Sequence, residues 1–93
     1  MNEVHAKLGK LLKLERERKD IKLADLSESL KISEEHLTHI ETGESDKLPA
    51  ELYFKLFAKA YAEALGIDFE ATMQAIQEDI AEQQAAQVSP EKD

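Results

Sequence analysis

The chain has 93 residues, which is enough for one small hydrophobic core and too short for a second domain. It contains no cysteine, so neither disulfide bonds nor a thiolate zinc site can stabilise it, and packed helices must do so. Its 20 acidic and 12 basic residues give a net charge of −8, the wrong sign for a protein that neutralises nucleic-acid phosphates. Because the sequence has no signal-peptide pattern and no apolar run of the roughly 18 residues that a membrane span needs, we expect a cytoplasmic protein.

The charge is distributed unevenly along the chain. Residues 1–22 carry seven basic and four acidic residues, whereas residues 67–93 carry one basic and seven acidic residues. A run of basic residues on a helix usually means only that this face is exposed to solvent. The simplest interpretation of the N-terminal basic residues is therefore a solvated helix face.

Hydrophobic periodicity predicts five helices and no strand. The first helix is expected over about residues 4–18, because apolar residues recur there at the spacing of one helix face. This pattern predicts that four side chains of the first helix face the core, namely those of Val4, Leu8, Leu11 and Leu12.

Residues 23–41 are expected to form a helix-turn-helix, with one helix over about 23–30 and a second over about 34–41. Ser33 can cap the second helix, because its hydroxyl can accept a hydrogen bond from the amides that open the helix. Gly43 is suited to the left-handed conformation that ends a helix. Two short helices joined by so short a turn are typical of modules that present their second helix to a groove.

A fourth helix is predicted over about 49–65, with Pro49 at its first helical position and Gly66 just beyond its last turn. This helix carries more apolar surface than one core contact needs, so we expect part of its aromatic stripe to remain for a partner. Its two predicted stripes are Leu52, Leu56 and Ala60, and Tyr53, Phe57 and Tyr61.

A fifth helix is predicted over about 69–86, with Asp68 as its cap. Residues 87–93 have too few apolar side chains to order themselves, so we expect a flexible tail after a single domain of residues 1–86. The apolar ridge of the fifth helix is expected either to pack back on the domain or to form a homodimer, and it consists of Phe69, Met73, Ile76 and Ile80.

Residues 8–44 resemble the helix-turn-helix of the Xre/Cro repressor superfamily, which implies an all-α, five-helix, lambda-repressor-like fold. The residues that carry this resemblance are Leu26, Leu30, the turn Ile32-Ser33, and the ending Ile40-Glu41 followed by Gly43. The segment that follows is similar to the corresponding part of the cytoplasmic domain in the RodZ family of bacterial cell-shape proteins. That similarity rests on Leu48-Pro49, Tyr53, Lys55, Phe57, Lys59, Tyr61-Ala62 and Leu65-Gly66-Ile67-Asp68.

The RodZ resemblance implies a non-enzymatic adaptor that docks on MreB, an actin-like filament of the bacterial cytoskeleton, through aromatic residues of its fourth helix. By position it assigns this protein-binding role to Tyr53 and Phe57, with basic positions at Lys55 and Lys59. Aromatic residues at helical spacing are more often core residues. Both a core and an interface position therefore stay open for Tyr53 and Phe57, whereas Tyr61 is expected in the core.

The sequence departs from the RodZ pattern in several respects. RodZ proteins carry a membrane-spanning helix after a linker, and this sequence has none. We therefore expect either the cytoplasmic part of a membrane-anchored protein or a soluble relative. Lys22 replaces the Ser or Thr that usually caps the first helix of the motif. Arg16 and Glu41 match positions that pair in many Xre domains, which predicts an ion pair between the first and third helices.

The alternative function is that of a DNA-binding transcriptional regulator of the Xre/Cro type. A recognition helix places its N-terminal residues on base edges, and here these include Glu34 and Glu35, whose carboxylates a polyanion repels. The remaining candidates are Ser33, Thr38 and His39 for base contacts and Lys22, Lys31 and Lys47 for phosphate contacts. This composition makes DNA binding the second choice.

Neither a metal site nor an active site is expected. His36 and His39 lie beside Glu35, but the pattern lacks the third neutral ligand that a zinc site needs. His36 is expected instead to pack where the family has an aromatic residue. The sequence has no nucleophile with an adjacent base and no glycine-rich phosphate loop, so we expect no enzyme and no cofactor.

Overall fold

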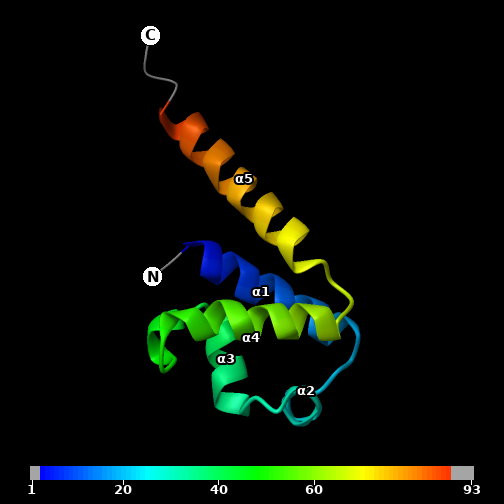
Figure 1. The fold of residues 1–93 in the computed structure, drawn as a ribbon. Coiled ribbons are helices and arrows are strands. Elements are labelled where there is room, and N and C mark those ends of the chain that lie inside the picture. Colours follow the sequence, from blue (N-terminus) through cyan, green and yellow to red (C-terminus); the bar gives the residue numbers. More distant parts are fainter. Residues whose placement is uncertain (1–2, 89–93) are drawn as a thin grey trace.

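The computed structural model describes residues 3–88, and within this range it contains five α-helices, one 3₁₀-helix and no strand (Figure 1). The predicted all-α, five-helix fold is therefore confirmed. The elements are α1 (Glu3–Arg18), α2 (Leu23–Leu30), α3 (Glu34–Thr42), η1 (Ser45–Lys47), α4 (Glu51–Ala64) and α5 (Phe69–Val88).

Helix α1 is central in the fold, because it contacts α3, α4 and α5. Helices α2 and α3 lie below α1 and α4 in the view of Figure 1, and α5 lies on the opposite side. The second half of α5 points away from the other helices. The helix-turn-helix and α5 are thus on opposite sides of the α1–α4 pair.

The core forms where the inward faces of all five helices meet. Its largest fully buried side chains come from α1, α3 and α4, and burial of each such side chain contributes roughly 2 kcal/mol to folding. They are Leu8, Leu12, Leu37, Ile40, Phe54 and Tyr61. Tyr61 is thus a core residue, as predicted.

The turn of the helix-turn-helix consists of residues 31–33. Lys31 ends α2 in the left-handed conformation, with φ of 62°. The Ser27 hydroxyl donates a hydrogen bond of 2.5 Å to the carbonyl oxygen of Ile32, whose side chain is buried. These contacts hold α2 and α3 together across the turn.

Three predicted helix signals have the expected geometry. The Ser33 hydroxyl accepts a hydrogen bond of 3.1 Å from the His36 amide at the start of α3. Gly43 ends the same helix with φ of 77°. The Asp68 carboxylate accepts a hydrogen bond of 3.0 Å from the Ala71 amide at the start of α5.

The predicted start of α4 at Pro49 is wrong, because α4 begins at Glu51 with Ala50 in an extended conformation before it. The preceding 3₁₀-helix was not predicted. Leu48 follows this short helix in an extended conformation and is buried. Leu48 is extended because the residue before a proline avoids the helical conformation, and Ala50 is extended as well, so α4 starts only at Glu51.

One predicted core assignment is also wrong, because Leu11 of α1 is 37% exposed. Of the two predicted apolar stripes on α4, the one with Leu52 and Leu56 faces outward, because these side chains are 67% and 51% exposed. On α4 a different stripe faces the core, one that begins at Phe54 and includes the fully buried Ala58. Alanine lets a neighbouring helix approach closely, so this stripe packs better than the one with two leucines.

Helix α5 packs back on α1 and α4, which is the first of its two predicted alternatives. Its apolar ridge therefore packs against the other helices of the same chain, and Phe69, Ile76 and Ile80 are buried there. The helix continues two residues past its predicted end, to Val88. The rest of the predicted tail lies outside the described residues. No helix between residues 3 and 88 has the length and apolar character needed to cross a bilayer.

Candidate protein-docking site

The exposed half of α4 carries three pairs of side chains that run along the helix. Residues four positions apart lie above one another on a helix, so each pair forms a row. The rows are Lys55 and Lys59, Leu52 and Leu56, and Tyr53 and Phe57. The helical rotation puts the leucine row between the lysine row and the aromatic row. This face therefore presents a band of apolar surface with a basic edge.

The aromatic row continues from α4 onto α3. The rings of Tyr53 and Phe57 are stacked, with their centroids 5.4 Å apart. The Phe57 ring is in turn stacked on the His36 ring, at 5.7 Å. His36 thus packs against α4 through the ring of Phe57. The three rings form one continuous surface across two helices.

The two aromatic residues of α4 are not equally buried. Tyr53 is 40% exposed, whereas Phe57 is half-buried and packs against the core. The two residues therefore differ, with Tyr53 in an interface position and Phe57 partly in the core. Tyr53 is available to a partner, and Phe57 both supports the core and shows part of its ring.

Charges of opposite sign flank this surface. Lys55 and Lys59 are exposed and form no ion pair with any side chain that the structure describes. On the α3 side, the Glu35 side chain is 82% exposed, with one carboxylate oxygen 3.8 Å from His39 Nε2. We refer below to Leu52, Tyr53, Lys55, Leu56, Phe57, Lys59 and His36 as the α4 surface.

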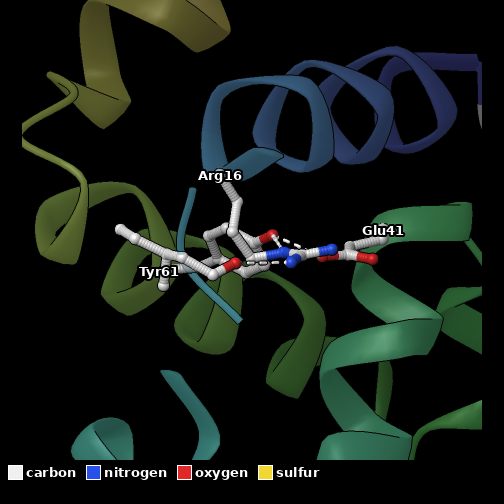
Figure 2. A network of polar contacts seen from close by, with 4 residues as sticks. Arg16, Glu41 and Tyr61 are labelled. Atoms are coloured by element: carbon white, nitrogen blue, oxygen red, sulfur yellow. Dashed lines mark hydrogen bonds and ion pairs between the residues drawn. The ribbon is translucent and has the colours of Figure 1, made fainter. Parts of the chain in front are cut away.

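A buried polar network fixes α4 from its other side (Figure 2). The Arg16 Nε group donates to Glu41 Oε2 at 2.8 Å and to the Tyr61 hydroxyl oxygen at 3.1 Å. The Tyr61 hydroxyl itself donates to Glu41 Oε2 at 2.5 Å. The predicted ion pair between α1 and α3 is confirmed. The network also joins α4 to both helices, and it thereby sets the direction in which the α4 surface faces.

Burial raises the pKa of Tyr61 above its ordinary value, and the hydrogen bond to Glu41 acts in the same direction. The role of Tyr61 in the network was not predicted from the sequence. Tyr61 lies 20 and 45 residues from its two partners, and a phenylalanine would give the same apolar pattern. No local signal could therefore have found it.

The chain matches the model of a protein family described as "helix-turn-helix domain" over residues 11–72, a range that includes α2, α3 and α4. The chain belongs to this family. Over 58 residues, or 62% of the chain, it is 38% identical to a Bacillus subtilis (strain 168) protein described as "uncharacterized membrane protein YmfM". No solved structure matches the chain. These matches confirm the Xre-type resemblance and agree with its RodZ-like character.

The chain spans only 20% of the length of this Bacillus relative. The similarity therefore concerns the helix-turn-helix domain and not the whole relative. The α4 surface lies inside the range that the family model matches.

Within the helix-turn-helix domain, the predicted DNA-contact residues are spread over several turns. The three lysines are exposed and lie before α2, after α2 and in η1, respectively. Ser33 uses its hydroxyl to cap α3, and Thr38 is exposed. His39 is mostly buried, with its ring nitrogens 3.8 Å from Glu35 and 3.5 Å from Glu44.

The exposed surface of α2 and α3 is more acidic than basic. Four of its exposed side chains are carboxylates, namely Asp25, Glu28, Glu34 and Glu35. Lys22 and Lys31 are the basic residues at the ends of α2. Among the described residues, the exposed carboxylates of α2 and α3 thus outnumber the two lysines at the ends of α2.

The structure gives no metal-binding geometry among the residues that it describes, where no cluster of three or more histidine or carboxylate ligands occurs. The two histidines of α3 have other contacts. His36 is stacked on Phe57, and His39 faces two glutamates.

Proposed function

We propose that this helix-turn-helix domain is a non-enzymatic docking adaptor that binds a protein partner through the α4 surface. The observation that carries the proposal is the band of exposed apolar side chains on α4, where Leu52 and Leu56 are more than half exposed beside Tyr53. Soluble domains rarely leave contiguous apolar surface uncovered unless it binds something. A tyrosine on such a surface is a typical anchor of protein interfaces.

We further propose that the partner is an actin-like filament of the MreB type and that the adaptor acts in cell-shape maintenance. This part of the proposal rests on the RodZ resemblance, which assigns the contact to Tyr53 and Phe57. The exposed Lys55 and Lys59 would meet acidic side chains of the filament and speed association. The apolar band would supply most of the binding free energy.

The domain is proposed to be the cytoplasmic part of a membrane-anchored protein. Two observations support this. The Bacillus relative is described as a membrane protein, and the chain spans a fifth of that relative's length. The proposed domain is the single unit of residues 1–86.

DNA binding remains the second candidate function, and the family membership itself favours it. The side chains of the helix-turn-helix argue against DNA binding. A DNA-binding surface needs several phosphate contacts on one face, and here four exposed carboxylates share α2 and α3 with the candidate lysines.

The proposal is tested by co-sedimentation of the chain with polymerised MreB-type protein. Substitution of Tyr53→Ala or Leu56→Ala should weaken binding about tenfold or more, because each removes an exposed anchor from the interface. The matched control is Leu14→Ala on α1, because Leu14 is 56% exposed and Leu56 is 51% exposed. This control should bind as the unaltered chain does. Since all three side chains are exposed, circular dichroism should give the same helix content for each variant.

The Tyr53→Ala, Phe57→Ala double variant should abolish co-sedimentation. Because Phe57 packs partly against the core, this variant is informative only alongside the single variants. Normal filament binding by folded single and double variants would exclude α4 as the site. Absence of binding by the unaltered chain would exclude this partner.

A further inference from the structure

A second uncovered apolar surface lies between α1 and α5. It is a groove of about 420 Å³, and its lining residues are Lys7, Lys10, Leu11, Leu14, Glu15 and Ile76. Leu14 is 56% exposed and Leu11 is 37% exposed, whereas Ile76 forms a buried floor. None of these residues belongs to α3 or α4, so the groove is separate from the α4 surface.

The two exposed leucines are not explained by the fold. Leu11 and Leu14 are three residues apart, so their side chains are neighbours on one side of α1. Helix α5 diverges from α1 in Figure 1, and Leu11 and Leu14 stay exposed although α5 contacts α1. The apolar surface that remains is a shallow groove lined by α1 and by Ile76 of α5.

The charge that is left around the groove is positive. Arg18 donates to both carboxylate oxygens of Glu15, at 2.6 and 3.1 Å, and thus neutralises it. Asp79 of α5 lies 3.8 Å from Lys7. Lys10 has no ion-pair partner among the described side chains. Residues 1–22 as a whole carry three more positive than negative charges.

We propose that this groove binds an amphipathic helix of a partner protein, with apolar residues on one face and acidic residues beside them. A helix fits because it presents apolar side chains at spacings of three and four residues, which match the spacing of Leu11 and Leu14. Acidic residues fit because they can pair with Lys10, the lining lysine that has no ion-pair partner among the described side chains.

An anionic membrane surface would also attract lysines and leucines, but the observations favour a helix. The leucines line a shallow groove whose floor is the buried Ile76, whereas a bilayer is flat at this scale. The whole chain carries a charge of −8, which an extended anionic surface would repel. A short helix inside the groove interacts mainly with charges within about 8 Å, and the lining lysine without an ion-pair partner among the described side chains is Lys10.

The groove makes the domain an adaptor with two independent contact surfaces, one on α4 and one between α1 and α5. This inference does not depend on the identity of the filament partner. Either surface can fail its test while the other passes.

The test is an NMR titration of the full 93-residue chain, with the methyl groups of Leu11, Leu14 and Ile76 as reporters. The probe is a synthetic 18-residue helical peptide with leucines at every third or fourth position and flanking glutamates. The control peptide carries lysines in place of the glutamates, and a second comparison uses phosphatidylglycerol vesicles. We expect saturable shifts of the three methyl reporters with the acidic peptide alone.

Two variants sharpen the test. Leu14→Gln should weaken binding of the acidic peptide about tenfold or more, because it removes an apolar anchor. Lys10→Glu should weaken it about fivefold, as expected for an exposed charge pair. Lys47→Glu is the matched charge reversal on η1, outside both the groove lining and the α4 surface, and it should leave the affinity unchanged.

The proposal is overturned if the acidic peptide causes no saturable shift at the groove or if the basic peptide binds equally well. It is also overturned if the vesicles shift the same methyl groups more strongly than the peptide does. Because Lys10 and Leu14 are exposed, their variants keep the fold, and unchanged amide spectra away from the groove verify this.

Discussion

Arg16 makes polar contacts to three different parts of the chain. Its guanidinium donates to the Glu41 carboxylate, to the Tyr61 hydroxyl and to the backbone carbonyl of Ile21, the last at 2.7 Å. The fixed, planar arrangement of its donors suits this number of acceptors, and a lysine would not reproduce it. Since the Arg16 and Glu41 side chains are only 11% and 6% exposed, removal of either would leave an uncompensated buried charge.

Tyr61 gives a prediction at this scale about pH. Its pKa is raised in the folded protein, whereas the unfolded chain has the ordinary value of 10.0. The unfolded state therefore loses the proton first, so the contribution to stability is complete below pH 10 and is lost as the pH rises above it. In this range the free energy of unfolding should fall by up to about 1.4 kcal/mol per pH unit from this group. Urea denaturation at several pH values measures the effect.

Tyr61→Phe is the control for this pH effect, because lysines also titrate in the same range. The difference in unfolding free energy between the unaltered chain and this variant should shrink as the pH rises above 10. In a Tyr53→Phe background, Tyr61 is the one remaining tyrosine, and its absorbance should then report deprotonation above pH 10. A Tyr61 that deprotonates in the folded state at or below pH 10 would contradict the prediction.

Residues whose role depends on their near neighbours were predictable from the sequence. Ser33, Gly43 and Asp68 act within a few residues of themselves, and each has the predicted geometry. The pairing of Arg16 with Glu41 required the family resemblance, because these residues lie 25 positions apart. The hydroxyl of Tyr61 could not be predicted, since an apolar stripe does not distinguish a tyrosine that donates a hydrogen bond from one that only packs.

At the scale of elements, α1 and α3 approach so closely that their crossing has room only for glycine. A Cβ atom at Gly9 would lie 2.1 Å from the carbonyl oxygen of Ile40 and 2.7 Å from that of Glu41. Both are backbone atoms, so no side-chain rotation could relieve the contact. The two helices would have to move apart, and the adjacent core would loosen with them.

Gly9→Ala should therefore destabilise the domain by about 3 kcal/mol, the upper part of the usual range for an overpacked core. The matched control is Gly66→Ala, because Gly66 has a φ of 76° but nothing within 4 Å of the added Cβ. That control should cost only about 1 kcal/mol of backbone strain. Denaturation by urea compares the two variants. A Gly9→Ala variant as stable as the unaltered chain would refute the close crossing.

The α4 surface shows which part of a site sequence periodicity can predict. The spacing of the apolar residues on α4 showed that the helix has more apolar surface than the core can cover. It therefore also predicted that some of these residues would face outward. Periodicity could not identify the inward stripe, because Phe54 with Ala58 and Leu52 with Leu56 have the same helical spacing. The stacking of His36 on Phe57 depends on how α3 meets α4, which no local pattern encodes.

At the scale of the whole molecule, the charge pattern separates the surfaces. Basic residues concentrate on α1, acidic ones on α5 and on the outer side of α2 and α3, and the α4 surface has its own lysine edge. A molecule with this arrangement attracts different partners to different sides. Exposed charges that lie more than about 8 Å apart act nearly independently at physiological salt.

This arrangement predicts weak binding to nonspecific duplex DNA. The chain should show little retention on a DNA column even at low salt, because the carboxylates of α2 and α3 repel the phosphates. A Glu34→Lys, Glu35→Lys variant should be retained more strongly, since it reverses the charge at the start of the recognition helix. Strong retention of the unaltered chain that falls steeply with added salt would favour the regulator function.

Apart from Phe57, which packs partly against the core, the inner and outer halves of α4 have no residue in common. Phe54, Ala58 and Tyr61 hold the helix in the fold, whereas Leu52, Lys55 and Leu56 take no part in the core. Selection on partner choice can therefore act on the outer residues without affecting folding. Related domains can acquire new partners by changing these outer positions while they keep the same helical framework.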